Sequence, residues 1–175
     1  MKIIWHYTTV EDFETILVEK RLRPSKLQRA SEARPPIWLS KQKFWDPTFA
    51  MMAYKKNKLT HLTMRQQYKL TGLVRIGIAF SDRFLSWENY KHAGLRNFFL
   101  LMTKERAAIK AGARTSDWFC SLKSVPPEDW IKIEKFDGVK WVRIKEIKIR
   151  LGNPSIQTPT VTDGRTENNT EFKKL

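Results

Sequence analysis

The run Leu73–Phe80 constrains the fold more than any other stretch of the sequence. Large apolar residues occupy every second position from Val74 to Phe80, and Arg75 and two small residues lie between them. This period-two alternation is typical of a strand with one buried face. We therefore expect a sheet, with Arg75 on its small-residue face, where the side chain can line a cleft.

A short strand and an amphipathic helix are predicted for residues 2–22. Thr8 and Glu11 have the spacing of a capping box, in which two side chains satisfy free amides at a helix start. Apolar residues then recur at helical spacing between residues 10 and 17. The helix is expected to end near Leu22, because Pro24 disfavours helical geometry in the residue before it.

The rest of the chain mixes further helices and strands. The sequence predicts four further strands, at residues 37–40, 118–122, 130–136 and 139–144. The dipeptide Asp137-Gly138 predicts a hairpin turn between the last two. Asp46-Pro47 predicts a helix with an inner face formed by Phe49, Met52 and Ala53. Thr63 and Gln66 form a second capping-box pattern with a stop at Gly72, and residues 98–111 predict a helix capped by Asn97.

These elements predict one α+β domain over residues 1–150, with helices flanking a sheet. The segment 151–175 is rich in Asn, Thr, Ser, Pro and Gly, and we expect it to be a polar, poorly ordered tail. That segment carries as many acidic as basic residues, so the whole net charge of +15 falls within residues 1–150.

Such a charge predicts salt-dependent attraction to polyanions, of which nucleic acid is the commonest. Acidic protein surfaces and phosphate-bearing small molecules are alternative partners, and a generally basic composition would explain the charge without any ligand. The lone Cys120 rules out an internal disulfide and favours the reduced cytoplasm. The start of the chain lacks the pattern of a signal peptide, and no apolar run is long enough to span a membrane.

Several chemical motifs are missing from the sequence. The three histidines have no paired metal-ligand spacing, and neither a phosphate-binding P-loop nor a GxGxxG loop is present. Cys120 lies in an apolar strand, which is more typical of the core than of a nucleophile.

The order of several short motifs along the chain is the most specific signal in the sequence. His6-Tyr7-Thr8 ends the first strand, and Leu22-Arg23-Pro24 ends the following helix. Trp38-Leu39-Ser40 ends the second strand, and Val125-Pro126 precedes the strand that begins at Trp130. This order resembles the ADP-ribosyltransferase fold, in particular the branch that includes DarT-type DNA ADP-ribosyltransferases and RNA 2′-phosphotransferases. The resemblance covers roughly residues 2–145, and specific residues support it mainly in the first third.

The resemblance implies a split β-sheet core and NAD as a substrate. His6 would then hydrogen-bond the ribose hydroxyls, Ser40 would hold the nicotinamide ribose, and an aromatic ring would stack on the cationic nicotinamide. The expected NAD-binding set is His6, Tyr7, Thr8, Trp38, Ser40 and Arg75.

The sequence differs from that branch at the catalytic carboxylate. Members of the branch carry a catalytic Glu on the strand before Val-Pro. The corresponding region, residues 115–122, contains Asp117 and no Glu. Asp117, together with His6, is our catalytic candidate; Glu128, Asp129 and Glu134 are the reserves. If no carboxylate enters the cleft, the protein would bind NAD or a nucleotide without transferring ADP-ribose.

A basic and aromatic run at residues 83–96 suits single-stranded nucleic acid, because bases stack on rings and phosphates meet cations. Its candidate contacts are Arg83, Trp87, Tyr90, Lys91 and Arg96, although an amphipathic surface segment would have the same pattern. We therefore expect an ADP-ribosyltransferase-like enzyme that acts on DNA or RNA rather than protein. The alternatives are a non-catalytic nucleic-acid-binding module with a degenerate nucleotide pocket, and a phage or mobile-element protein that binds an acidic partner.

Overall fold

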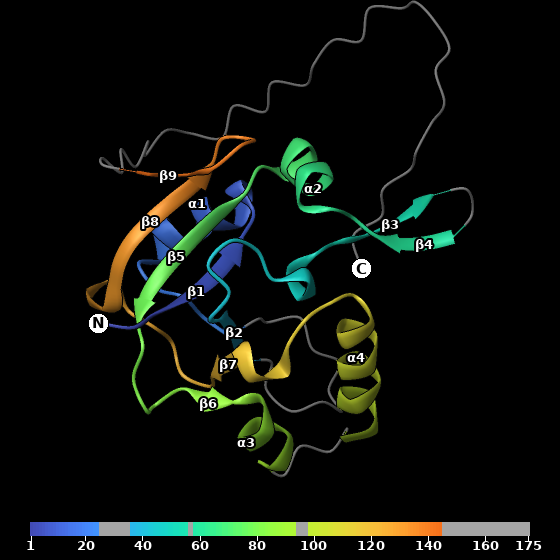
Figure 1. The fold of residues 1–175 in the computed structure, drawn as a ribbon. Coiled ribbons are helices and arrows are strands. Elements are labelled where there is room, and N and C mark those ends of the chain that lie inside the picture. Colours follow the sequence, from blue (N-terminus) through green and yellow to red (C-terminus); the bar gives the residue numbers. More distant parts are fainter. Residues whose placement is uncertain (25–35, 56–57, 94–97, 145–175) are drawn as a thin grey trace, which may run out of the picture.

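Seven antiparallel strands form the main sheet of the computed structural model, in the order β6-β7-β2-β1-β5-β8-β9 (Figure 1). The structure describes residues 1–24, 36–55, 58–93 and 98–144, so the expected tail and Asn97 lie outside the described residues. Mixed helix and strand structure is confirmed. The strands of this sheet are β1 (Ile3–Thr8), β2 (Ile37–Ser40), β5 (Val74–Ala79), β6 (Leu85–Ser86), β7 (Trp118–Ser121), β8 (Trp130–Phe136) and β9 (Trp141–Arg143).

Strand β5 is the alternating run of the sequence, and it pairs with β1 on one side and β8 on the other. Val74, Ile76 and Ile78 are fully or almost fully buried on one face of the sheet, within the main apolar cluster. Gly77 lies on the opposite face, where an added Cβ would come within 3.0 Å of the Trp5 ring. The small residues of the run thus leave room for large rings of the neighbouring strand.

Helix α1 (Val10–Glu19) covers the first face of the sheet, which we call the α1 face (Figure 1). Its N-cap is Thr9, whose hydroxyl accepts from the Asp12 amide, so the predicted cap at Thr8 was wrong by one residue. The helix ends at Lys20, a left-handed residue with φ 50°, earlier than predicted. Leu22 leaves the helix because its backbone forms a β-bridge with Val125.

A second apolar cluster covers the other face of the sheet near β2 and β7. Helix α3 (Trp87–His92) contributes two buried rings to it, and β7 contributes Trp118 and Cys120. Helix α4 (Phe98–Lys110) packs beside them and is tied to α3 by the buried ion pair between Lys91 and Glu105. None of the helices in the described ranges is long and apolar enough to cross a membrane.

The predicted helix beginning at Asp46-Pro47 is wrong beyond its first turn. Asp46 does cap a helical turn, but it is the three-residue η1 (Pro47–Phe49). The chain then forms an antiparallel hairpin of β3 (Met52–Lys55) and β4 (Lys58–His61), which projects from the domain (Figure 1). The spacing of Phe49, Met52 and Ala53 therefore reflects a turn and a strand rather than one helix face.

The predictions for α2 and for the β8–β9 hairpin agree more closely with the structure. Helix α2 (Met64–Thr71) has the reciprocal capping box of Thr63 and Gln66, and Gly72 follows it, as predicted. The hairpin of β8 and β9 is also confirmed, with β8 at its predicted bounds. Its turn falls later than predicted: the Asp137 carboxylate accepts from the backbone amides of Val139 and Lys140. Strand β9 is consequently shorter than predicted.

Candidate functional site

The junction between β1 and β2 joins two parts of the main sheet: β6, β7 and β2 on one side, and β1, β5, β8 and β9 on the other. In the described part of the chain these two strands share one ladder pair, Trp5 with Ser40. Past this pair, the His6 side chain bridges the strands, with Nδ1 3.0 Å from the Trp38 carbonyl oxygen. A carbonyl oxygen only accepts, so Nδ1 carries the proton, and Nε2 of the neutral ring is an acceptor.

The charge state of His6 follows from its environment. Burial lowers the pKa of the ring below its ordinary value of 6.5, against weaker opposing effects of the Trp38 hydrogen bond and the Asp12 carboxylate. His6 is therefore neutral near pH 7. A neutral imidazole with a fixed tautomer offers Nε2 to a hydroxyl donor or to a proton.

Ser40 does not share a pocket with the His6 side chain, contrary to the expectation from sequence. Ser40 is paired with Trp5, and successive side chains of a strand point to opposite faces. Ser40 therefore shares the face of Trp5 and Tyr7, which we call the loop face, and His6 points to the α1 face. Ser40 is fully buried, and its hydroxyl donates to Asp46 Oδ2 at 2.6 Å.

Tyr7 and Thr8 also point to opposite faces. Tyr7 is buried on the loop face, where its hydroxyl donates to the Gln42 carbonyl oxygen at 2.6 Å. Burial is the main cause of the raised pKa of Tyr7, partly offset by the nearby Arg75 cation. Thr8 is half-buried at the end of β1, opposite Val74 of β5, and therefore on the α1 face with His6.

Arg75 lies on the loop face, as predicted, but it is buried and engaged. Its guanidinium donates to Glu134, with Nε 2.6 Å from Oε2, and to the carbonyl oxygen of Lys43. The guanidinium also lies over the rings of Trp5 and Trp141, at 3.9 and 4.5 Å from their centroids. A cation surrounded in this way fixes the strands and the loop above them, and it is not exposed to a pyrophosphate.

The loop that follows β2 is held on the sheet by three successive carbonyl groups. Tyr7 donates to the carbonyl of Gln42, Arg75 to that of Lys43, and Trp141 Nε1 to that of Phe44, the last at 2.7 Å. Gln42 also donates through its backbone amide to Ser40 Oγ and through Nε2 to Asp117 Oδ2. Gln42 was missed at the level of sequence, where nothing distinguishes it from other loop residues.

Asp117 lies at the end of the three-residue η2 (Thr115–Asp117), beside the end of β2. Its Oδ2 accepts from Gln42 Nε2 at 2.5 Å and from Arg114 Nε at 2.9 Å, and its side chain is 14% exposed. Among the reserve carboxylates, Glu134 is paired with Arg75 and Lys132, Asp129 with Arg83, and Glu128 is exposed. Asp117 is thus linked to the chain that follows β2 through its side chain and also through its backbone carbonyl, which accepts from the Lys41 amide at 2.8 Å.

The basic and aromatic run at residues 83–96 does not present stacking rings, which corrects the prediction from its composition. Trp87 and Tyr90 are each 4% exposed and pack against Trp38 in the second cluster. Lys91 is buried; burial opposes its charge, but hydrogen bonds to Glu88 and Glu105 outweigh that effect and raise its pKa. Arg83 pairs with Asp129 at the surface, and Arg96 lies outside the described residues.

Neither Cys120 nor a cluster of potential metal ligands forms a second catalytic or metal-binding site in the described part of the chain. Cys120 is fully buried, and burial raises the pKa of its thiol to about 12, so it is protonated and inert at neutral pH. Within residues 1–24, 36–55, 58–93 and 98–144, no cluster of three or more His, Cys, Asp or Glu side chains is arranged to hold a metal ion.

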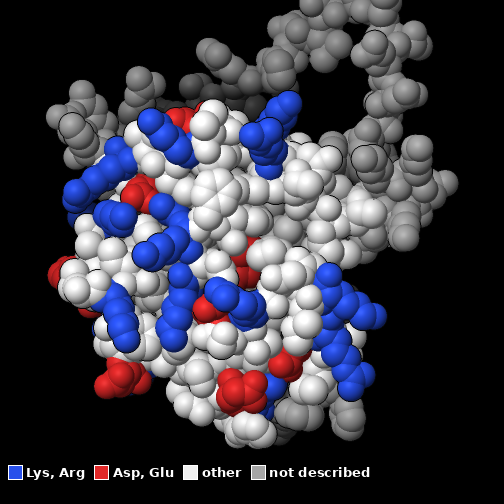
Figure 2. Space-filling view, in the orientation of Figure 1, with Lys and Arg blue, Asp and Glu red and all other residues white. Residues whose placement is uncertain are grey.

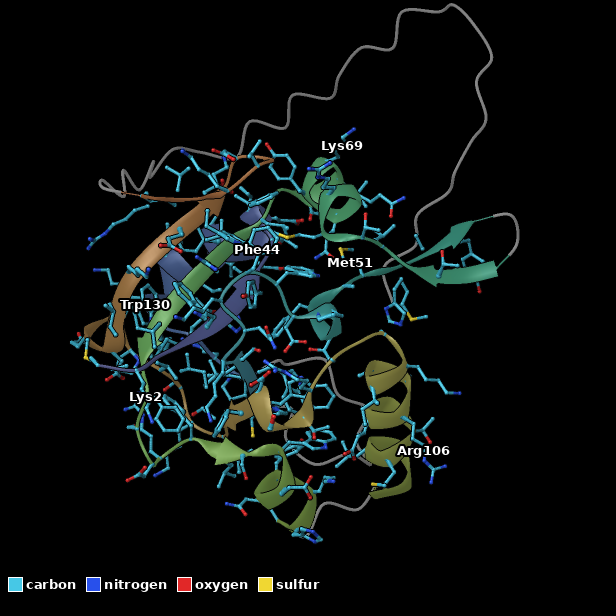
Figure 3. All side chains as sticks on the ribbon, in the orientation of Figure 1. Lys2, Phe44, Met51, Lys69, Arg106 and Trp130 are labelled. Atoms are coloured by element: carbon cyan, nitrogen blue, oxygen red, sulfur yellow. The ribbon has the colours of Figure 1, made fainter. Side chains whose placement is uncertain are left out.

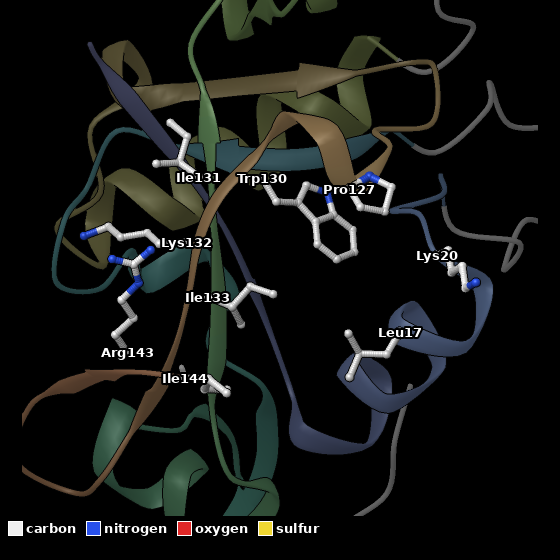
Figure 4. Close-up of a pocket in the computed structure, with 9 residues that line it drawn as sticks. All are labelled: Leu17, Lys20, Pro127, Trp130, Ile131, Lys132, Ile133, Arg143 and Ile144. Carbon is white, nitrogen blue, oxygen red and sulfur yellow. The ribbon is translucent and has the colours of Figure 1, made fainter. Parts of the chain in front are cut away.

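An open pocket of about 450 Å³ lies between α1 and β8 (Figure 4). Its lining includes none of the predicted site residues. Comparisons with protein-family models, curated proteins and solved structures found no match to this chain.

Replacing Arg75 by Met is expected to lower the free energy of unfolding by about 3 kcal/mol, because Glu134 would keep a buried charge with Lys132 as its remaining partner. The double variant Arg75→Met/Glu134→Leu removes both buried charges and should be less destabilised than the single variant. Urea denaturation of the wild type and the two variants measures this. A double variant destabilised as much as Arg75→Met, or more, would contradict the assigned role of Arg75.

The lowered pKa of His6 predicts a pH-dependent stability. The unfolded chain takes up a proton near pH 6.5, whereas folded His6 resists it, so stability present above that pH is lost as the pH falls. In His6→Gln this loss should disappear. Melting temperatures at about pH 7.5 and about pH 5.5 should therefore differ more for the wild type than for the variant; equal differences would show that His6 is not held neutral.

Proposed function

We propose that this protein is an NAD-dependent ADP-ribosyltransferase-like enzyme whose acceptor is nucleic acid. The observation that carries the proposal is the β1–β2 junction. Two parts of one sheet meet there through a single ladder pair, and a neutral His6 bridges the strands. A division of the sheet at this point agrees with the split core that the sequence resemblance implies.

His6 is the residue of the expected set that best fits a ligand contact. It is half-buried, and its Nε2 is an acceptor because Nδ1 donates to the Trp38 carbonyl. A ribose hydroxyl of NAD is a suitable donor to it. Ser40, Tyr7 and Arg75 are buried and engaged, so we assign them to positioning of the loop and the junction.

The proposed reaction breaks the bond between the nicotinamide nitrogen and the ribose C1′. Nicotinamide leaves with the bonding electron pair, C1′ bonds to a nucleophilic atom of the acceptor, and the acceptor releases a proton. Positive charge develops on the ribose in the transition state, and a nearby carboxylate stabilises it electrostatically. Asp117 takes this role in the proposal, held in place by Gln42 and Arg114.

Nicotinamide release from NAD in the presence of single-stranded DNA or RNA tests the proposal. His6→Ala should reduce the rate at least about 100-fold, and Asp117→Asn by a similar factor because the developing charge loses its counter-charge. The melting temperature of each variant reports whether the fold persists.

His61→Ala is the matched control, since His61 is exposed on β4, outside the junction, and its loss should leave the rate unchanged. A wild-type protein that neither binds nor cleaves NAD would refute the enzyme proposal.

A nucleic-acid-binding role without catalysis is the second candidate, and one surface favours it. Lys and Arg side chains dominate the face of β5 and β8 in Figure 2, and Phe44 lies on the same face of the molecule (Figure 3). Phe44 is 58% exposed, although the backbone around it is fixed by the three carbonyl contacts. Lys43 precedes Phe44 in the chain, and Lys140 and Arg143 lie next to and two residues beyond Trp141, whose indole donates to the Phe44 carbonyl; all three cations are exposed. A rigid exposed ring beside exposed cations suits an unpaired base.

Phe44→Ala should therefore raise the dissociation constant for a single-stranded oligonucleotide by about tenfold. Its salt dependence should stay the same, because the ring neutralises no phosphate. Fluorescence anisotropy at two salt concentrations measures both quantities. Ile109→Ala removes an apolar side chain of similar exposure from α4 and should have no effect. Equal affinity of wild type and Phe44→Ala would rule out stacking at this surface.

A further inference from the structure

The hairpin of β3 and β4 stands apart from the main sheet, and α2 fixes its base. In the described part of the chain neither strand pairs with the seven-stranded sheet, and Figure 1 shows the hairpin projecting from the domain beside α2. The Met51 carbonyl accepts from the Leu62 amide, and the Met51 amide donates to Oε1 of Gln67 on α2, each at 2.8 Å. Gln67 is buried, so a buried contact orients the hairpin. We call the hairpin together with α2 the basic arm.

Acidic residues are absent from the segment that contains the basic arm. The sequence has no Asp or Glu between Asp46 and Asp82. The Lys and Arg residues of the arm are Lys55, Lys56, Lys58, Arg65 and Lys69. Those on α2 are exposed and four residues apart, hence on one helix face, and neither forms an ion pair with any described residue. No carboxylate of the arm neutralises this charge, so its field favours a polyanion.

The outer end of the hairpin also exposes an aromatic ring. Successive side chains of a strand point to opposite faces, and Ala53 is buried whereas its neighbours Met52 and Tyr54 are exposed. Tyr54 is 52% exposed and precedes Lys55, whose ladder partner Lys58 forms with it the pair nearest the turn. A two-stranded hairpin without further strands is only marginally stable in water. The exposed ring beside a pair of lysines therefore indicates a surface that a partner covers.

Duplex DNA fits this surface in shape and in charge. The major groove of B-form DNA is about 12 Å wide and admits a two-stranded β-ribbon. The deep, narrow major groove of an A-form RNA duplex does not admit side chains in this way. A second copy of the arm is a poor occupant, because every charged residue of the arm is basic and like charges opposite one another are destabilising.

We propose that the basic arm binds duplex DNA, with the outer half of the hairpin in the major groove and α2 on the flanking phosphate backbone. Tyr54 contacts base edges, and Arg65 and Lys69 pair with phosphate groups. His61, at the end of the hairpin away from the turn, lies outside this contact. The choice of nucleic acid rests on the proposed function above, and the arm specifies that the acceptor lies in or next to a DNA duplex.

Fluorescence anisotropy without NAD, with a labelled DNA duplex of about two helical turns, tests the proposal. Arg65→Gln/Lys69→Gln should weaken binding about tenfold and reduce the slope of log affinity against log salt by about two, because two phosphate contacts are lost. Lys55→Gln/Lys58→Gln should have a similar effect. Tyr54→Ala should weaken binding about fivefold and leave the slope unchanged, because the phenol ring neutralises no phosphate.

Arg106→Gln/Lys110→Gln is the matched control. These exposed side chains have the same types and the same four-residue spacing as the α2 pair, but they lie on α4 (Figure 3). Their replacement should leave both the affinity and the slope unchanged. A loss equal to that of the α2 variant would reduce the effect to overall charge and would overturn the proposal. Unchanged duplex binding in both double variants of the arm would also overturn it.

Other polyanions identify the partner. Duplex RNA of the same sequence should bind at least about tenfold more weakly than duplex DNA, and equal affinities would contradict insertion into the major groove. Poly-L-glutamate that competes as well as DNA would show a surface for acidic proteins instead. Because these measurements contain no NAD, they are independent of catalysis. DNA binding through the arm without NAD cleavage would refute only the enzyme proposal, whereas NAD cleavage with arm-independent duplex binding would refute only the role of the arm.

Discussion

Among the residues that the structure describes, a single ladder pair, Trp5 with Ser40, connects the two parts of the sheet, and two side-chain hydrogen bonds also cross the junction. His6 reaches across to the Trp38 carbonyl on the α1 face, and Tyr7 reaches across to the Gln42 carbonyl on the loop face. Each bond fixes β2 and the loop after it relative to β1. The position and tautomer of His6 are therefore consequences of how the two parts meet.

The loop face is stabilised by a different kind of interaction, a buried guanidinium. Arg75 joins β5 to β8 through Glu134 and to the loop through Lys43, with the rings of Trp5 and Trp141 on its faces. Burial of this cation is tolerable because its donors meet a carboxylate and a carbonyl. The same contact holds Phe44 at the surface, so one buried residue links the sheet to the exposed aromatic surface.

Local elements could be predicted from the sequence because their signals are local. The alternation of β5, the bounds of β8 and the capping box of Thr63 and Gln66 each depend on residues close in the chain. The face to which His6 or Ser40 points depends on the register between β1 and β2, which no local pattern specifies. Burial of Trp87 and Tyr90 likewise depends on β7 and α4, so their composition alone suggested a binding surface.

In the proposed function, the neutral His6 ring at the junction presents Nε2 to NAD. Long-range ¹⁵N–¹H correlation spectra of the histidine side chains, recorded with and without NAD at neutral pH, test it directly. We predict the Nδ1–H tautomer for His6 in the free protein and a change in its Nε2 chemical shift at saturating NAD. An Nε2–H tautomer, or a His6 ring that does not respond to NAD, would contradict it.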